Sequence, residues 1–153
     1  MDASQQPTLS LYRPEWRALA LGLAVSHLMT KPSFMRIRFG ELSQLLAGVI
    51  NRDHYFFVVD ETHRVQGFAG WALTSRNNAE DWLNSRRGLR SSDCLAGECI
   101  VMNAWSANST SAHRYMLKEA RRLLQDKDAL FFKRYYEDGS TRPVRINMLG
   151  LSL

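Results

Sequence analysis

The chain has few of the residues that usually settle a function from sequence alone. It has two cysteines, Cys94 and Cys99, and no second Cys/His pair at metal-site spacing, which argues against a zinc ribbon and against a disulfide framework. We therefore expect no metal and two reduced thiols. The longest apolar run, residues 18–29, contains Ser26 and His27 and is too short to span a bilayer. With no visible signal peptide, we expect a cytoplasmic protein without stable membrane insertion.

Glycine is absent from a long stretch in the second half of the chain. No glycine occurs between Glu98 and Asp138. This excludes a glycine-rich loop that would cradle a phosphate in that part of the chain.

Composition and charge are those of one soluble globular domain. The 153 residues are 45% hydrophobic and 23% charged, with a formal net charge of +5. A basic surface favours an acidic partner, such as nucleic acid, an anionic membrane or an acidic carrier protein, although the charge also aids solubility. Because no nucleic-acid-binding motif is present, we expect no nucleic-acid partner.

Hydrophobic periodicity predicts an α+β (mixed α/β) domain with a mostly antiparallel central sheet flanked by helices. The expected order is α-α-β-β-α-β-α-β-β, in a domain covering residues 13–153 that follows a flexible N-terminal segment, residues 1–12. The expected helices cover residues 14–30, 40–51, 77–87 and 109–125, and the expected strands cover Tyr55–Val59, Val65–Thr74, 98–103, 129–136 and 142–149.

This element order resembles the GNAT acyltransferase fold. The resemblance implies that an acyl-pantetheine donor lies along the central strand and that its phosphates bind at the start of the following helix. Unpaired N–H groups and a partial positive charge favour anions at that end of a helix. The corresponding segment here is residues 103–111. The missing glycines set it apart from the acetyl-coenzyme A enzymes of this superfamily.

A narrower resemblance is to the toxin-activating lysine acyltransferases, which are GNAT-like enzymes that lack the usual glycine loop and take the acyl group from acyl carrier protein. It covers roughly residues 20–145 and depends on the order of several short matches rather than on one motif. The matching features are Leu21-Gly22 before Pro32, Gly70-Trp71-Ala72 at the end of a hairpin, residues 97–103 as the central strand, and residues 132–139 in the last hairpin.

Two departures from that family concern its catalytic positions. Phe34 stands where the family has the histidine of its Ser-Pro-x-His-Arg motif, and Asn103 best matches its catalytic aspartate. Either this chain uses other residues for the chemistry, or it keeps the fold as a non-catalytic binding module.

Acyl transfer to an amine needs a base and a group that stabilises an oxyanion. We expect His54, beside Asp53 at a helix-to-strand junction, to be the base, and His27 to be the second candidate. Asn103 is expected to orient the amine or stabilise the oxyanion. Each of these residues also has a plainer interpretation. His54 would be a loop histidine that bonds to the backbone, His27 a partly buried helix histidine, and Asn103 a cap at the end of a strand. His63 and His113 are weaker candidates, His113 as a phosphate contact.

The resemblance implies a donor site on the central strand and the helix after it, although plain helix capping would explain the hydroxyl residues equally well. Its members are Ala104, Trp105, Ser109, Thr110, Ser111 and Arg114. Arg114 also begins a basic stripe with Lys118, Arg121 and Arg122, which either docks an acidic carrier protein or is simply a solvated face.

We therefore expect an N-acyltransferase that moves a fatty acyl group from acyl carrier protein to a lysine, or a similar residue, of a protein toxin or ribosomally made peptide. No tightly bound cofactor is expected; the acyl-phosphopantetheine donor is a substrate. The partners would be the carrier protein and the acceptor, with a homodimer left open. The alternatives are a GNAT enzyme that uses acyl-coenzyme A on a small amine, and a binding module.

Overall fold

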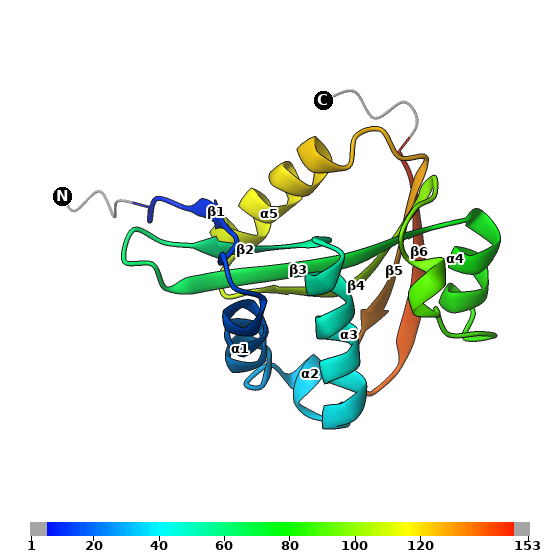
Figure 1. Ribbon diagram of the computed structural model, residues 1–153, viewed down its shortest axis with the longest axis horizontal. Coiled ribbons are helices and arrows are strands. Elements are labelled where there is room, and N and C mark those ends of the chain that lie inside the picture. The colour runs from blue at the N-terminus through cyan, green and yellow to red at the C-terminus, as the bar shows by residue number, and fades with distance from the viewer. Residues whose placement is uncertain (1–5, 149–153) are drawn as a thin grey trace.

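A computed structural model gives the structure of the protein and describes residues 6–148. One six-stranded sheet in the order β1-β2-β3-β4-β5-β6 carries helices on both faces (Figure 1). Neighbouring strands are antiparallel except β4 and β5, which are parallel. The strands are β1 (Ser10–Tyr12), β2 (Tyr55–Val59), β3 (Val65–Thr74), β4 (Cys99–Ala107), β5 (Ala129–Tyr135) and β6 (Thr141–Asn147), and the helices are α1 (Arg17–Leu28), α2 (Pro32–Met35), α3 (Phe39–Asn51), α4 (Arg76–Leu83) and α5 (Thr110–Leu123), with a 3-10 turn at Ser91–Asp93.

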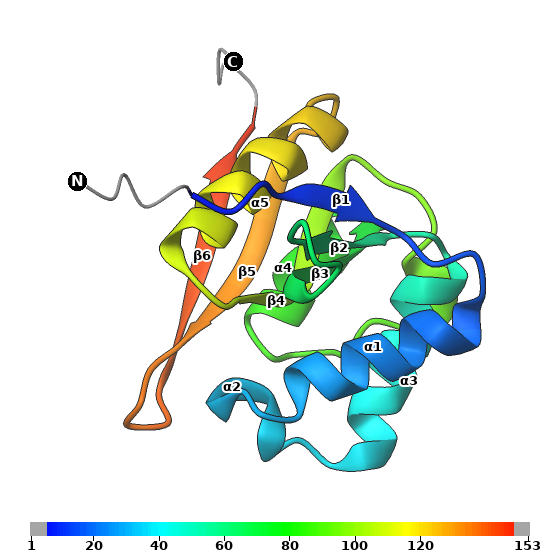
Figure 2. The same ribbon diagram turned by 90° about the vertical axis from the view of Figure 1, so that its left-hand side faces the viewer.

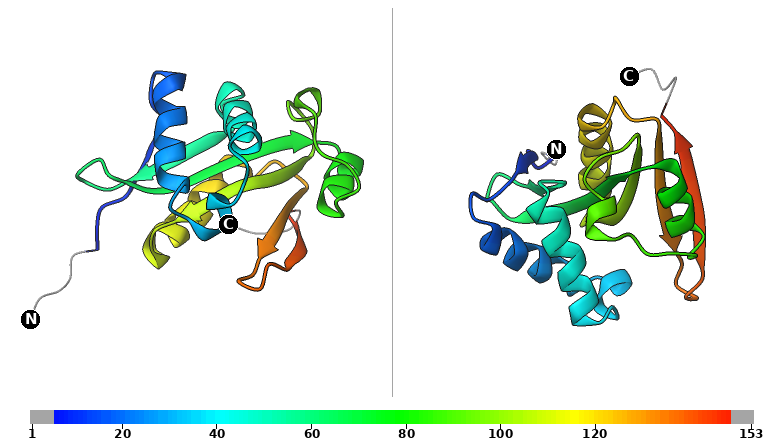
Figure 3. Two further views of the ribbon diagram at one scale, coloured as in Figure 1. Left: turned by 90° about the horizontal axis from the view of Figure 1, so that it is seen from below. Right: turned by 45° about the vertical axis from the view of Figure 1, so that its right-hand side comes forward.

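The core has a part on each face of the sheet. Helices α1 and α3 cover one face around Phe57, Phe68 and Ala104. Helix α5 covers the opposite face, where Met116 packs against Met102. Figures 2 and 3 show α1 and α3 on one side of the strands and α5 on the other. The fold class predicted from the sequence is therefore confirmed.

The structure departs from the predicted elements in several places, one of which is α4, because it ends at Leu83 and not at residue 87. Strand β1 lies inside residues 1–12, the segment expected to be flexible, and it pairs with β2 from Ser10 opposite Val59. The short α2 follows α1 directly and was not predicted. Strand β4 continues four residues past Asn103 to Ala107 because residues 104–107 pair with residues 67–70 of β3. The part of the predicted last strand at residue 149 lies outside the described residues.

Strand β4 contains the irregularity that shapes the site. Gly70 pairs with Ala104, whereas the next residue of β3, Trp71, pairs with Met102, so Asn103 is an extra residue in β4. Such a bulge bends a strand and redirects its side chains. Strand β5 pairs only with the first residues of β4, 99–101. The second half of β4 therefore keeps one edge that β5 does not cover.

Gly97 fixes the entry into β4. Its φ of +153° is one that other residues rarely adopt, and an added Cβ would lie 2.1 Å from the carbonyl oxygen of Thr74. Only glycine lets the chain pass this close to the end of β3. Within residues 6–148 no helix has the length and apolar character needed to cross a bilayer.

Candidate active site

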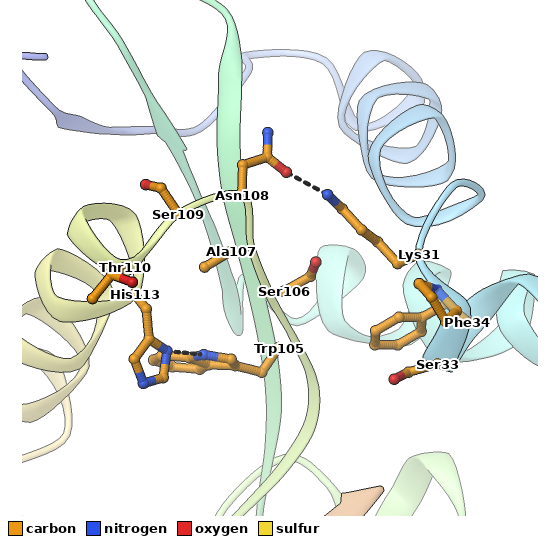
Figure 4. A pocket seen from close by; sticks show the side chains of 11 residues that line it. Lys31, Ser33, Phe34, Trp105, Ser106, Ala107, Asn108, Ser109, Thr110 and His113 are labelled. Atoms are coloured by element: carbon orange, nitrogen blue, oxygen red, sulfur yellow. Dashed lines mark hydrogen bonds between the residues drawn. The ribbon is translucent and has the colours of Figure 1, made fainter. Parts of the chain in front are cut away.

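A cavity of about 470 Å³ lies where β4 ends and α5 begins. Figure 4 shows β4 passing between α5 on one side and the segment after α1 on the other. The volume is within the usual range for a small-molecule site, and the space is an open groove rather than an enclosed cavity. Its walls are formed by Lys31, Pro32, Ser33 and Phe34 on the helical side and by residues 105–110 with His113 on the strand side.

The first turn of α5 gives the cavity a place for an anion. Ser109 is the N-cap, and its Oγ accepts a hydrogen bond of 3.1 Å from the backbone N of Ala112. The other N–H groups at the start of this 14-residue helix have no partner within the helix. Because the helix dipole adds a partial positive charge there, a phosphate or carboxylate is favoured at Ser109 and Thr110.

Trp105 forms one wall and is held by His113. The indole Nε1 donates to His113 Nδ1 at 3.0 Å, and the two rings meet edge to face (Figure 4). With Nδ1 accepting, a neutral His113 carries its proton on Nε2. The side chain of Trp105 also packs on the α5 face of the core, so its position is set from two sides.

Lys31 crosses from the helical side to the strand side of the cavity. Its Nζ donates to Asn108 Oδ1 (Figure 4). Asn108 is itself fixed by its amide, which donates to the carbonyl of Val65 at 3.2 Å and to Gln66 Oε1 at 3.4 Å. None of the ion pairs of residues 6–148 includes Lys31. Its ammonium is thus a cation without an ion-pair partner among these residues, and it lines the same cavity as the start of α5.

Asn103 occupies the bulge upstream of the cavity. Its Oδ1 is buried and has no hydrogen-bond partner among the described residues. A buried amide oxygen without a donor costs about 1–3 kcal/mol. The bulge and the uncovered edge of β4 together leave backbone groups and this amide available to an extended ligand.

His54 lies in a separate cluster at the start of β2 and does not line the cavity. Its ring stacks on Trp71 at 6.1 Å with an interplanar angle of 10°. Burial and the charges of Arg52 and Arg13 lower its pKa, and its Nδ1 is buried without a partner. Its carbonyl accepts from the backbone N of Trp71 at 3.0 Å. Because Trp71 pairs with Met102, His54 lies in the same cross-strand row as the bulge.

The remaining residues singled out in the sequence are partly brought together. Trp105, Ser109 and Thr110 line the cavity, and His113 joins them. Ala104 is buried against α1 and α3, so only its backbone can serve a ligand. Neither Ser111 nor Arg114 is among the lining residues. His27 lies against the backbone of Ser106 and lines a second cavity.

Lys31 and Asn108 are the site residues that sequence analysis did not find. The signal for Lys31 was its place between a helix and Pro32, with no acidic neighbour nearby. Asn108 looked like part of a loop because β4 was expected to end four residues earlier. Its role depends on contacts with β3, which no local pattern reveals.

Comparison with known proteins supports the fold and goes no further. No family model matches the sequence, and no curated protein matches it either. Among solved structures, the loading GNATL domain of CurA from Lyngbya majuscula superimposes with a TM-score of 0.53 at 9% identity, covering 86% of this chain and 67% of that one. A protein described as histone acetyltransferase HPA2 and related acetyltransferase, from Corynebacterium glutamicum, gives 0.48 at 12% identity, covering 88% and 80%. The chain has a GNAT-like fold.

Proposed function

We propose that the protein is an acyltransferase that takes an acyl group from a phosphopantetheine thioester and passes it to an amine. The observation that carries the proposal is the bulge at Asn103, because it opens an uncovered edge of β4 that leads directly into the cavity at the start of α5. An extended arm with amide groups can pair with such an edge as an added strand would.

The two ends of the donor have matching features in the chain. The phosphate would lie at the N–H groups of Ser109 and Thr110, with Lys31 across the cavity. Trp105 and Phe34 would flank the apolar part of the arm. The thioester would then lie toward Asn103, where β4 is distorted.

The reaction itself needs little covalent help from the protein. The amine nitrogen attacks the thioester carbon, the C–S bond breaks, the thiol leaves with a proton, and the ammonium proton must be removed beforehand. We assign the oxyanion contact to the Nδ2–H groups of Asn103, which donate, and not to its unpartnered Oδ1, which can only accept. We assign the base to His54, because burial keeps its imidazole neutral at neutral pH and its row of the sheet includes the bulge.

The finer proposal concerns donor and acceptor. The missing glycines and the basic residues Arg114 and Lys118 on exposed α5 favour acyl carrier protein over coenzyme A. The solved neighbour described as a loading domain is compatible with a carrier-borne acyl group. The acceptor would be a lysine of a protein toxin or ribosomally made peptide, as the family resemblance implies.

A direct assay tests the proposal. The purified protein is mixed with long-chain acyl carrier protein, or with acyl-coenzyme A, and a lysine-containing peptide encoded by a neighbouring gene, and intact masses are measured. We expect an acyl mass shift on the peptide. If no donor supports transfer, yet carrier protein or peptide binds, the chain is a non-catalytic GNAT-fold binding module, a reading favoured by Phe34 at the position of the family histidine.

A further inference from the structure

A second cavity of about 310 Å³ lies between the last turns of α1 and the start of β3. It shares Lys31 and Asn108 with the first cavity, so the hydrogen bond between these two side chains separates the two spaces. Its other lining residues are Leu23, Ser26, His27, Thr30 and Val65. The acyl-transfer proposal assigns no role to this space.

His27 presents an unfilled acceptor to this cavity. The side chain is only 8% exposed, and Nε2 is buried without a hydrogen-bond partner. The backbone of Ser106 raises the pKa of the ring, and because Nε2 has no partner we assign Nδ1 as the nitrogen that donates to the Ser106 carbonyl. Burial, and then the charge of Lys31, lower its pKa and keep the ring neutral. A neutral ring that donates from Nδ1 carries a lone pair on Nε2 and needs a donor there.

Lys31 gives the second cavity a positive charge that can bind an anion. Among residues 6–148, the ammonium of Lys31 donates a hydrogen bond only to the neutral amide of Asn108, and no carboxylate of these residues forms an ion pair with it. An anion in the cavity would gain a charge-assisted hydrogen bond to this ammonium. The same ammonium disfavours a cationic amine as the group that donates to His27, so the donor should be neutral, and a hydroxyl is the smallest such group.

We propose that the second cavity binds a small hydroxylated anion, whose hydroxyl donates to His27 Nε2 and whose carboxylate or phosphate pairs with Lys31. The hydroxyls of Ser26 and Thr30 lie on the same wall, and Leu23 and Val65 contact the carbon skeleton. Binding draws Lys31 away from Asn108 and joins the two cavities. Occupancy of the second cavity thereby controls the shape of the first.

Two hydroxylated anions, 3-hydroxybutyrate and glycerol 3-phosphate, serve as probes, and butyrate and glycerol serve as matched controls. Binding is followed by NMR through the ring resonances of His27, assigned by their loss in a His27→Asn variant. We expect at least one probe to shift these resonances and to bind about tenfold more tightly than its control, the scale of one satisfied buried acceptor. Which probe binds identifies the anion.

Two variants separate the contacts, and their affinities are measured by isothermal titration calorimetry because His27→Asn lacks the ring resonances of His27. His27→Asn keeps a donor for the Ser106 carbonyl but lacks Nε2, so it should bind 3-hydroxybutyrate no better than butyrate. Lys31→Met should bind glycerol 3-phosphate no better than glycerol. Ser33→Ala, which lines only the first cavity, should bind both probes as the wild type does. The proposal is wrong if neither probe shifts His27 or if the hydroxyl preference survives in His27→Asn. Because the readout is binding, acyl transfer can fail without affecting it.

Discussion

Asn103 is the extra residue of the β4 bulge, and its amide oxygen has no partner in the described part of the chain. If the amide stabilises the oxyanion, Asn103→Ala should reduce turnover about 10- to 1000-fold, the range for a lost oxyanion donor. The melting temperature should stay close to that of the wild type, because no protein contact of Oδ1 is removed. Single-turnover kinetics with acyl carrier protein measures the rate, and unchanged turnover would show that the asparagine serves only the bulge.

His54 and His27 are both neutral imidazoles with an unpartnered nitrogen, but they lie against different strands. His54→Ala should lower the acylation rate about 100-fold, a usual loss for a general base. The deficit should shrink as the pH rises, because the acceptor amine then loses its proton without help. His27→Ala is the matched comparison and should cost much less. If the wild type and both variants acylate at the same rate, neither histidine is the base, and desolvation of the amine accounts for the loss of its proton.

At the scale of the element, the N-cap of α5 connects stability to donor binding. Ser109→Ala removes the hydrogen bond to Ala112 N and should cost about 1 kcal/mol, or roughly 2–4 °C in melting temperature. Ser75→Ala removes the corresponding cap of α4, where Ser75 accepts from Asn78 N. Both variants should lose similar stability, but only Ser109→Ala should weaken donor binding in a calorimetric titration. Equal donor affinity for the two variants would show that the phosphate does not bind at the start of α5.

The sequence predicted most of these elements because their patterns are local. The run of β-forming residues in β2 and the apolar face of α3 predicted the bounds of both elements to within one residue. The end of β4 could not be predicted, because its last four residues are held by pairing with β3 rather than by their own propensity. The same limit applies to the site. Ser109 could be recognised as a cap, whereas Lys31 and Asn108 meet only because the fold brings the segment after α1 to the end of β4.

At the scale of the whole molecule, the buried histidines make stability depend on pH. The pKa values of His27 and His54 lie below the ordinary 6.5, so the unfolded chain binds more protons than the folded one just below that pH. The free energy of unfolding should therefore fall as the pH is lowered from about 7 to about 5. Urea titrations across this window measure it. The double variant with asparagine at both positions should show a flatter dependence, and an equally steep one would assign the effect to other groups.

The charge of the whole molecule decides the last prediction, the choice of donor. The chain carries a net charge of +5, and Arg114, Lys118 and Arg121 are exposed on α5, the helix that begins at the cavity, whereas Arg122 is paired with Glu119 at 2.8 Å. An acidic carrier protein should be drawn to this side by long-range attraction, which salt screens within about 10 Å at roughly 0.1 M. Raising the salt from about 50 mM to about 500 mM should therefore raise KM for acyl carrier protein with little change in kcat, because screening acts on encounter and not on the thioester.

Lys118→Glu should raise KM even at low salt, whereas Arg122→Glu, at a position already neutralised by an ion pair, should do so less. Acetyl-coenzyme A is the decisive comparison: a higher kcat/KM with it than with acyl carrier protein would show that the donor is a nucleotide and that the basic face of α5 is only a solvated surface.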